Sequence, residues 1–215
     1  MHRRNFLSTT ALLAAGISPL SLLASNIAGD TTPPDELMVI GPKDGYAPQV
    51  GTLVSMLNYN RNTIIGITKG LTIEQLDYLH DPKANTIGAM LMHLGATEVF
   101  YQANTFEGRQ DFDDAEKKIW NDAMELGDAG RKSIKGKDAS YYIDLITGVR
   151  NKTLHVLKSK DDKWLMEIDK QWSNDKRSIN TYWKWFHVCE HESNHRGQIA
   201  FLKSRLPGVK PSGND

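Results

Sequence analysis

Two histidines four residues apart, His191 and His195, are the side chains of this sequence with the clearest capacity for chemistry. The stretch around them, residues 179–206, contains no proline and carries apolar residues at helical spacing, which predicts a helix. Residues four apart on a helix leave one face as neighbours, so the two imidazoles can bind one divalent ion. His187 lies one further turn back. The spacing predicts a metal site that needs at least one more ligand from elsewhere in the chain.

His93 is the best candidate for that third ligand. It lies in a second apolar helical pattern, residues 86–106, and facing helices are a common place for metal sites because each can project a ligand inward. Other interpretations stay open. A single histidine in this position is also explained as a hydrogen-bonded core residue, and the pair His191 and His195 as part of a solvated helix face.

The string from His191 to His195 also matches the His-Glu-x-x-His pattern of zinc metalloproteases, whose glutamate is a general base. Those enzymes usually take a third ligand from further along the chain. After His195 this chain has no His or Glu and only the terminal Asp215, so the protease patterns lack that ligand. Glu192 is then predicted to be an exposed surface carboxylate, and the sequence identifies no catalytic residue.

Other chemically capable side chains receive simpler interpretations. Cys189 is the only cysteine, which excludes an intramolecular disulfide and a cysteine-based metal cluster, and it is predicted to be a buried, inert thiol. His80 and His155 have no partner at metal spacing and are predicted to be surface residues. The remaining aromatic group, interpreted as core and interface residues, comprises Trp183, Trp185 and Phe186.

The elements that position these residues are predicted to be helices. Long amphipathic patterns cover residues 49–69, 86–106, 140–158 and 179–206, a short capped helix begins after Thr72, and residues 107–136 suit a shorter helix with a connecting loop. No segment shows sustained period-two alternation, so strands are not expected. The fold class is therefore predicted to be all-α, a four-helix bundle over residues 49–207 with a tail at 208–215.

Composition agrees with one domain of ordinary size. The chain has 215 residues, of which 40% are hydrophobic, enough for a single core. Lys and Arg together number 26, as do Asp and Glu, so charge gives no argument for nucleic acid or an anionic membrane as a partner.

The N-terminal residues 1–28 are predicted to be an export signal. Arg3 and Arg4 precede a moderately apolar run, which resembles a bacterial twin-arginine signal and predicts an exported, periplasmic protein. Gly, Ser and Pro interrupt the run, so no stable membrane anchor is expected after the signal is removed. The proline-containing residues 29–48 are predicted to be an extended leader.

Two stretches resemble a known family. The first runs from Asn85 to Leu94 and is followed by Glu98, and the second runs from His187 to Ile199. Together they are similar to the DinB-like (DinB/YfiT-like) metalloenzyme family, over about residues 49–207. The resemblance implies an up-down-down-up four-helix bundle, usually a homodimer. It also implies a divalent metal held by three histidines, which here are His93, His191 and His195.

Characterised members of that family are thiol-dependent transferases or isomerases that use low-molecular-weight thiols such as bacillithiol or mycothiol. The resemblance implies a small-molecule substrate and a metal that keeps open positions for water, a substrate atom or a thiol sulfur, lowering the pKa of the thiol. His187 and Gln198 could orient ligands or substrate around it. Three imidazoles suit Zn, Ni or Fe, and by ligand type also Cu.

Two other functions stay open at this point. A hydrolase using metal-bound water would share the ligands, and a non-catalytic bundle could use the three histidines only to stabilise its fold. An open coordination position beside a cavity favours an enzyme, whereas a fourth protein ligand favours a structural site.

Overall fold

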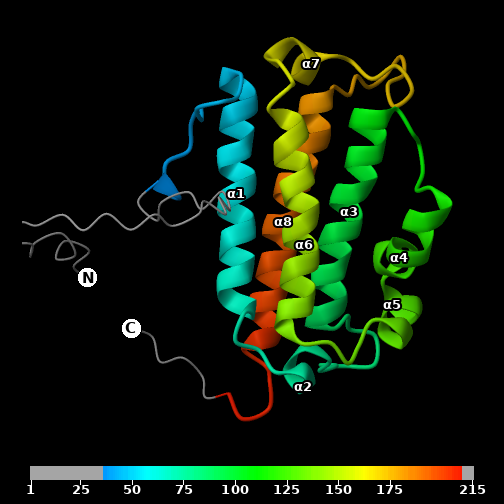
Figure 1. The fold of residues 1–215 in the computed structure, drawn as a ribbon. Helices are drawn as coiled ribbons and strands as arrows, with labels where there is room; N and C mark the ends of the chain where they lie inside the picture. The colour runs from blue at the N-terminus through cyan, green and yellow to red at the C-terminus, as the bar shows by residue number, and fades with distance from the viewer. Residues whose placement is uncertain (1–35, 210–215) are drawn as a thin grey trace, which may run out of the picture. The chain divides into compact units, whose positions relative to one another are not determined.

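The computed structural model describes residues 36–209, whose regular structure is helical. Eight helices follow one another in this part of the chain (Figure 1): α1 Pro48–Thr68, α2 Ile73–Leu76, α3 Ile87–Glu107, α4 Asp114–Glu125, α5 Gly127–Ser133, α6 Ala139–Leu157, α7 Asp162–Met166 and α8 Thr181–Lys203. These residues form no strand, only two isolated β-bridges in the connection from α7 to α8. The predicted all-α class is confirmed.

Several predicted segments fall partly or wholly outside the described residues. These are the export signal at 1–28, the start of the leader at 29–48 and the end of the tail at 208–215. The described part of the leader lies against α1, where the backbone nitrogen of Gly41 donates a hydrogen bond to Ser55 Oγ at 3.2 Å. Among residues 36–209, no helix combines the length and apolar character that a membrane span requires.

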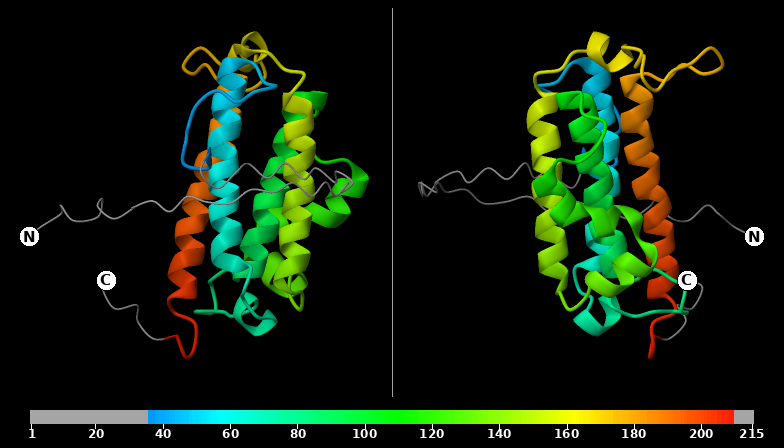
Figure 2. Two further views of the ribbon diagram at one scale, coloured as in Figure 1. Left: turned by 60° about the vertical axis from the view of Figure 1, so that its left-hand side comes forward. Right: turned by 90° about the vertical axis from the view of Figure 1, so that its right-hand side faces the viewer.

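Four long helices, α1, α3, α6 and α8, lie side by side. α3 contacts both α6 and α8, and α1 contacts the same two helices. Figures 1 and 2 show that α1 and α8 run in one direction and that α3 and α6 run in the other. The connection from α3 to α6 carries α4 and α5, which flank α3. The two histidine-bearing helices, α3 and α8, are therefore direct neighbours.

Side-chain caps start the helices that carry the site. Thr86 accepts a hydrogen bond from the backbone nitrogen of Ala89 at the start of α3, and Asn180 accepts one from Trp183 at the start of α8. Each cap satisfies a backbone donor that the helix itself leaves unpaired. Gly108, with φ of 70°, ends α3 in the left-handed conformation that glycine adopts without strain.

One predicted detail was wrong, and one helix was not predicted. The segment 107–136 contains two helices, because Leu126 and Gly127 both have positive φ, 54° and 56°, and break the helix into α4 and α5. The structure also contains α7, which the sequence pattern did not indicate. The long helices match their predicted ranges to within three residues at each end.

The core consists of two groups of buried apolar side chains at different heights along the long helices. One group includes Ile64, Leu91, Leu94, Ile146 and Ile199, and the other includes Leu53, Leu57, Leu157, Trp185 and Val188. Glycine permits close packing in the first group: a Cβ added at Gly95 would lie 2.8 Å from the ring of Trp120 on α4. Arg61, Arg150 and Glu192 fall between the two groups on α1, α6 and α8.

Candidate metal centre

Three histidine side chains converge between α3 and α8. The Nε2 atom of His191 lies 3.1 Å from Nε2 of His93 and 3.2 Å from Nε2 of His195. His191 and His195 occupy successive turns of α8, and His93 faces them from the second turn of α3. One nitrogen from each ring falls within 4.8 Å of the others. We call these three residues the histidine triad.

A backbone carbonyl fixes the orientation of the His93 ring. Nδ1 of His93 lies 2.8 Å from the carbonyl oxygen of Ala123, near the end of α4. A carbonyl oxygen only accepts hydrogen bonds, so Nδ1 carries the proton and donates it. The lone pair of Nε2 then faces His191, which is the arrangement that metal-binding histidines have in proteins.

Burial keeps the triad uncharged. Removal from water, together with a smaller effect of the neighbouring imidazoles, lowers the pKa of His191 to about 3 and that of His195 to about 4. Burial also lowers the pKa of His93, although its bond to the Ala123 carbonyl opposes this effect. Neutral imidazoles have the lone pairs that a metal requires.

The arrangement fits a divalent metal. Nitrogens that bind one tetrahedral zinc at about 2.0–2.1 Å lie about 3.3 Å apart, close to the two shorter separations in the triad. Nδ1 of His191 and Nδ1 of His195 are buried and make no hydrogen bond within the described residues. Without an ion, the three rings would direct their Nε2 atoms at one another, which is an unfavourable use of polar groups.

The comparisons agree with this geometry. A family model described as mycothiol-S-transferase matches residues 52–208, a range that contains all three histidines. The chain belongs to the mycothiol-S-transferase family. This is a DinB/YfiT-like family, so the resemblance predicted from the sequence is confirmed. No curated protein matches the chain.

His187 and Gln198 were predicted to orient ligands or substrate around the metal. Both lie beside the triad and neither is part of it. The ring of His187 is 5.8 Å from that of His191, stacks on Trp183 at 5.3 Å and places its Nδ1 2.8 Å from a carboxylate oxygen of Glu190. Gln198, one turn after His195, is exposed and donates a hydrogen bond to Asn194 at 3.3 Å.

A buried cluster of charges lies next to the triad. Arg61 of α1 and Arg150 of α6 each bind both Glu98 of α3 and Glu192 of α8. Arg61 Nη2 is 2.7 Å from Glu98 Oε2, and Arg150 Nε is 2.8 Å from Glu98 Oε1. All four side chains are at least 96% buried. We call this group the Arg–Glu cluster; it joins all four long helices.

The prediction that Glu192 is exposed was wrong. Glu192 is 1% exposed and accepts hydrogen bonds from both Arg61 and Arg150. Its position on α8 is about 100° round the helix from His191, which turns it toward α1 and α6. Burial would raise the pKa of Glu98, but the charges of Arg150 and Arg61 outweigh that effect and hold the pKa below its usual value.

The other predicted residues have clear positions. Cys189 is a buried free thiol, as predicted. Burial raises the pKa of this thiol, and Asn60 Nδ2 lies 3.1 Å from its sulfur. His80 and His155 are exposed, as predicted. Of the aromatic group, only Trp185 belongs to the core, because Trp183 and Phe186 are 43% and 47% exposed.

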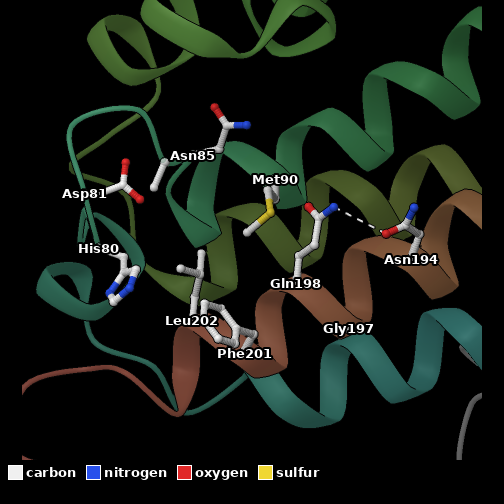
Figure 3. A pocket seen from close by; sticks show the side chains of 10 residues that line it. His80, Asp81, Asn85, Met90, Asn194, Gly197, Gln198, Phe201 and Leu202 are labelled. Carbon is white, nitrogen blue, oxygen red and sulfur yellow. Dashed lines mark hydrogen bonds between the residues drawn. The ribbon is translucent and has the colours of Figure 1, made fainter.

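Two cavities lie along the face of α8 that carries the triad. One, of about 330 Å³, touches His93 and His191 and is walled by α3, α4 and α8. The other, of about 460 Å³, does not touch the triad. Figure 3 shows its lining, where Asn194, Gln198 and Phe201 of α8 lie opposite the loop that carries His80 and Asp81. Only the smaller cavity adjoins the candidate metal ligands.

Proposed function

We propose that this member of the mycothiol-S-transferase family is a metal-dependent thiol S-transferase in which His93, His191 and His195 hold a divalent metal, either Zn, Ni or Fe. The observation that carries the proposal is the convergence of three neutral imidazole nitrogens, two from buried and one from a partly buried side chain, beside a cavity. Within residues 36–209, no fourth His, Cys, Asp or Glu joins the group. A site with three protein ligands keeps a position for substrate, which favours an enzyme over a structural site.

The second substrate is a low-molecular-weight thiol. A divalent metal on three imidazoles supplies a Lewis acid that lowers the pKa of a thiol. The sulfur then forms a bond to an electrophilic carbon, and the electron pair of the bond that breaks at that carbon goes to a leaving group or neighbouring atom, which takes up the thiol proton. The chain contributes the fixed His93 ring and a sheltered cavity next to it.

The Arg–Glu cluster supports thiol transfer over hydrolysis. A hydrolase needs a general base that can accept a proton from water. Glu98, the carboxylate closest in sequence to His93 on α3, is bound by two arginines. The charges of Arg150 and Arg61 outweigh the effect of burial and hold the pKa of Glu98 below its usual value, which makes it a poor proton acceptor.

We also propose the topology of the helical bundle and its oligomeric state. The contacts and directions of α1, α3, α6 and α8 support an up-down-down-up four-helix bundle, with the domain bounded at residues 49–207. We propose a homodimer, for which the exposed Trp183 and Phe186 offer apolar surface. Light scattering of the purified protein measures this state directly.

Export to the periplasm is also proposed, from the motif Arg3-Arg4 and the apolar run after it. Replacing both arginines by lysine tests it. Cell fractionation should then find the variant in the cytoplasm and the parent in the periplasm, whereas unchanged fractionation contradicts twin-arginine export.

The function is tested by measuring metal content and thiol conjugation on the same preparations. The parent, a His191→Ala/His195→Ala variant and a His155→Ala control are loaded with Zn, Ni or Fe, and elemental analysis gives their metal content. Conjugation of mycothiol or bacillithiol to a fluorogenic electrophile should require metal, persist in the control and disappear in the double variant. Stoichiometric metal without conjugation of any thiol would point to a non-catalytic site. Absence of metal in the parent would remove the basis of the proposal.

A further inference from the structure

Two buried residues of α3 present hydroxyl groups to the cavity beside the histidine triad. Thr97 and Tyr101 follow His93 at four-residue steps on α3, so all three side chains leave one face of the helix. Both residues line the cavity of about 330 Å³ that also touches His93 and His191. They are only 7% and 5% exposed. Their hydroxyls therefore belong to the cavity wall.

Neither hydroxyl forms a hydrogen bond with another group of residues 36–209. Neither hydroxyl oxygen is among the fully buried, unpartnered atoms of these residues, so both are open to the cavity. Burial, with the negative charge of Glu190, raises the pKa of Tyr101 to about 12, so its phenol stays protonated at neutral pH and is able to donate. The cavity thus presents two unused hydrogen-bond donors.

The rest of the wall is mixed, with Phe100, Phe112 and Met124 apolar and Asp111, Asn121, Glu125 and His187 polar or charged. Phe100 makes edge contacts with Tyr101 and with Phe112, at ring-centre distances of 5.6 and 6.0 Å, and Met124 of α4 completes the apolar part. A volume of about 330 Å³ suits a small molecule rather than a polymer. Apolar rings beside a few placed polar groups are typical of a small-molecule site.

We propose that this cavity binds the electrophile of the reaction, and that the electrophile is a small conjugated carbonyl compound whose oxygen accepts hydrogen bonds from Tyr101 and Thr97. This inference rests on the proposed thiol transfer. Addition of a thiol to such a compound forms one C–S bond and one C–H bond and opens one C=C π bond, so no further reactant is needed. The electron pair moves onto the carbonyl oxygen, where the two hydroxyls stabilise the charge, and the thiol proton ends on the α-carbon.

The test measures binding with unreactive probes rather than turnover. Fluorine NMR titration of the zinc-loaded protein compares 4-fluoroacetophenone with 1-ethyl-4-fluorobenzene, which has a similar shape but no acceptor oxygen. The ketone should bind at least fivefold more tightly. Tyr101→Phe and Thr97→Val, which remove only the hydroxyls, should each weaken ketone binding about three- to tenfold and leave hydrocarbon binding unchanged. Tyr141→Phe, on the exposed start of α6, serves as the control.

Three results would overturn the inference: equal affinity of the parent for both probes, a ketone preference that survives in the Tyr101→Phe/Thr97→Val variant, or binding of neither probe. Thermal unfolding checks that the variants are folded, and Thr97→Val gives an independent test if Tyr101→Phe is unstable. The result is separable from the proposed function. Ketone preference without thiol conjugation contradicts the transferase but not the site, and conjugation without ketone preference contradicts only the site.

Discussion

Nδ1 of His93 and the carbonyl oxygen of Ala123 are 2.8 Å apart, which couples the candidate metal ligand on α3 to a helix outside the four long ones. α4 therefore belongs to the site although it provides none of the three Nε2 atoms. Its packing against α3 depends on Gly95, where the ring of Trp120 leaves no room for a Cβ.

Gly95→Ala should weaken metal binding. The added methyl would lie 2.8 Å from the Trp120 ring, so α4 must shift and carry the Ala123 carbonyl away from His93. Loss of such a hydrogen bond typically costs 10- to 100-fold in metal affinity, and we expect about tenfold here, measured by competition with a chelator. The control is Gly148→Ala on α6, where no atom lies within 4 Å. An unchanged affinity in Gly95→Ala would contradict the role of α4.

Glu192→Gln should lower the free energy of unfolding by about 3–5 kcal/mol, because it leaves two buried arginines with one carboxylate. Urea unfolding measures this change. Glu190→Gln, two residues away and exposed, should cost about 1 kcal/mol or less. Equal effects of the two substitutions would show that the Arg–Glu cluster does not stabilise the fold.

The contribution of Glu98 should depend on pH. Its folded-state pKa lies below the ordinary value of 4.5, so the carboxylate stabilises the fold fully above about pH 4.5. That stabilisation is lost as the pH falls through the folded-state pKa. The difference in unfolding free energy between the parent and Glu98→Gln should accordingly be constant near neutrality and shrink in acid. A difference that grows in acid has the wrong sign for this cluster.

Cys189 should be unreactive in the folded protein. Its thiol is buried, its pKa is raised, and Asn60 lies 3.1 Å from the sulfur. Because it is the only cysteine, labelling with a disulfide reagent reports on this site alone. We expect labelling at least 100-fold slower in buffer than in guanidinium chloride. Fast native labelling would contradict the prediction of an inert thiol.

Much of the fold could be predicted from local pattern. The apolar residues of α1 repeat at helical spacing, and the predicted range 49–69 differs from Pro48–Thr68 by one residue at each end. The two histidines of α8 were identified for the same reason, since a four-residue step determines which side chains are neighbours. Their approach to His93 depends on how α3 packs against α8, which the spacing alone did not establish.

The features that could not be predicted from the sequence share a physical cause. Arg61 and Arg150 are charged, and charged side chains ordinarily indicate solvent, so nothing in the sequence marked them as buried partners of Glu98 and Glu192. The Ala123 carbonyl is a backbone atom that every residue possesses, and its role depends on where α4 packs. Contacts between residues far apart in the sequence produce no repeating pattern from which they could be predicted.

The Arg–Glu cluster should allow the site to lose and regain its ion while the protein stays folded. Small zinc domains assemble only around their metal and unfold when it is removed. Here Arg61 and Arg150 already hold α3 and α8 together through charges that are not metal ligands. A chelator should therefore remove the metal without a change in circular dichroism. The emptied site would keep its shape and bind the metal again.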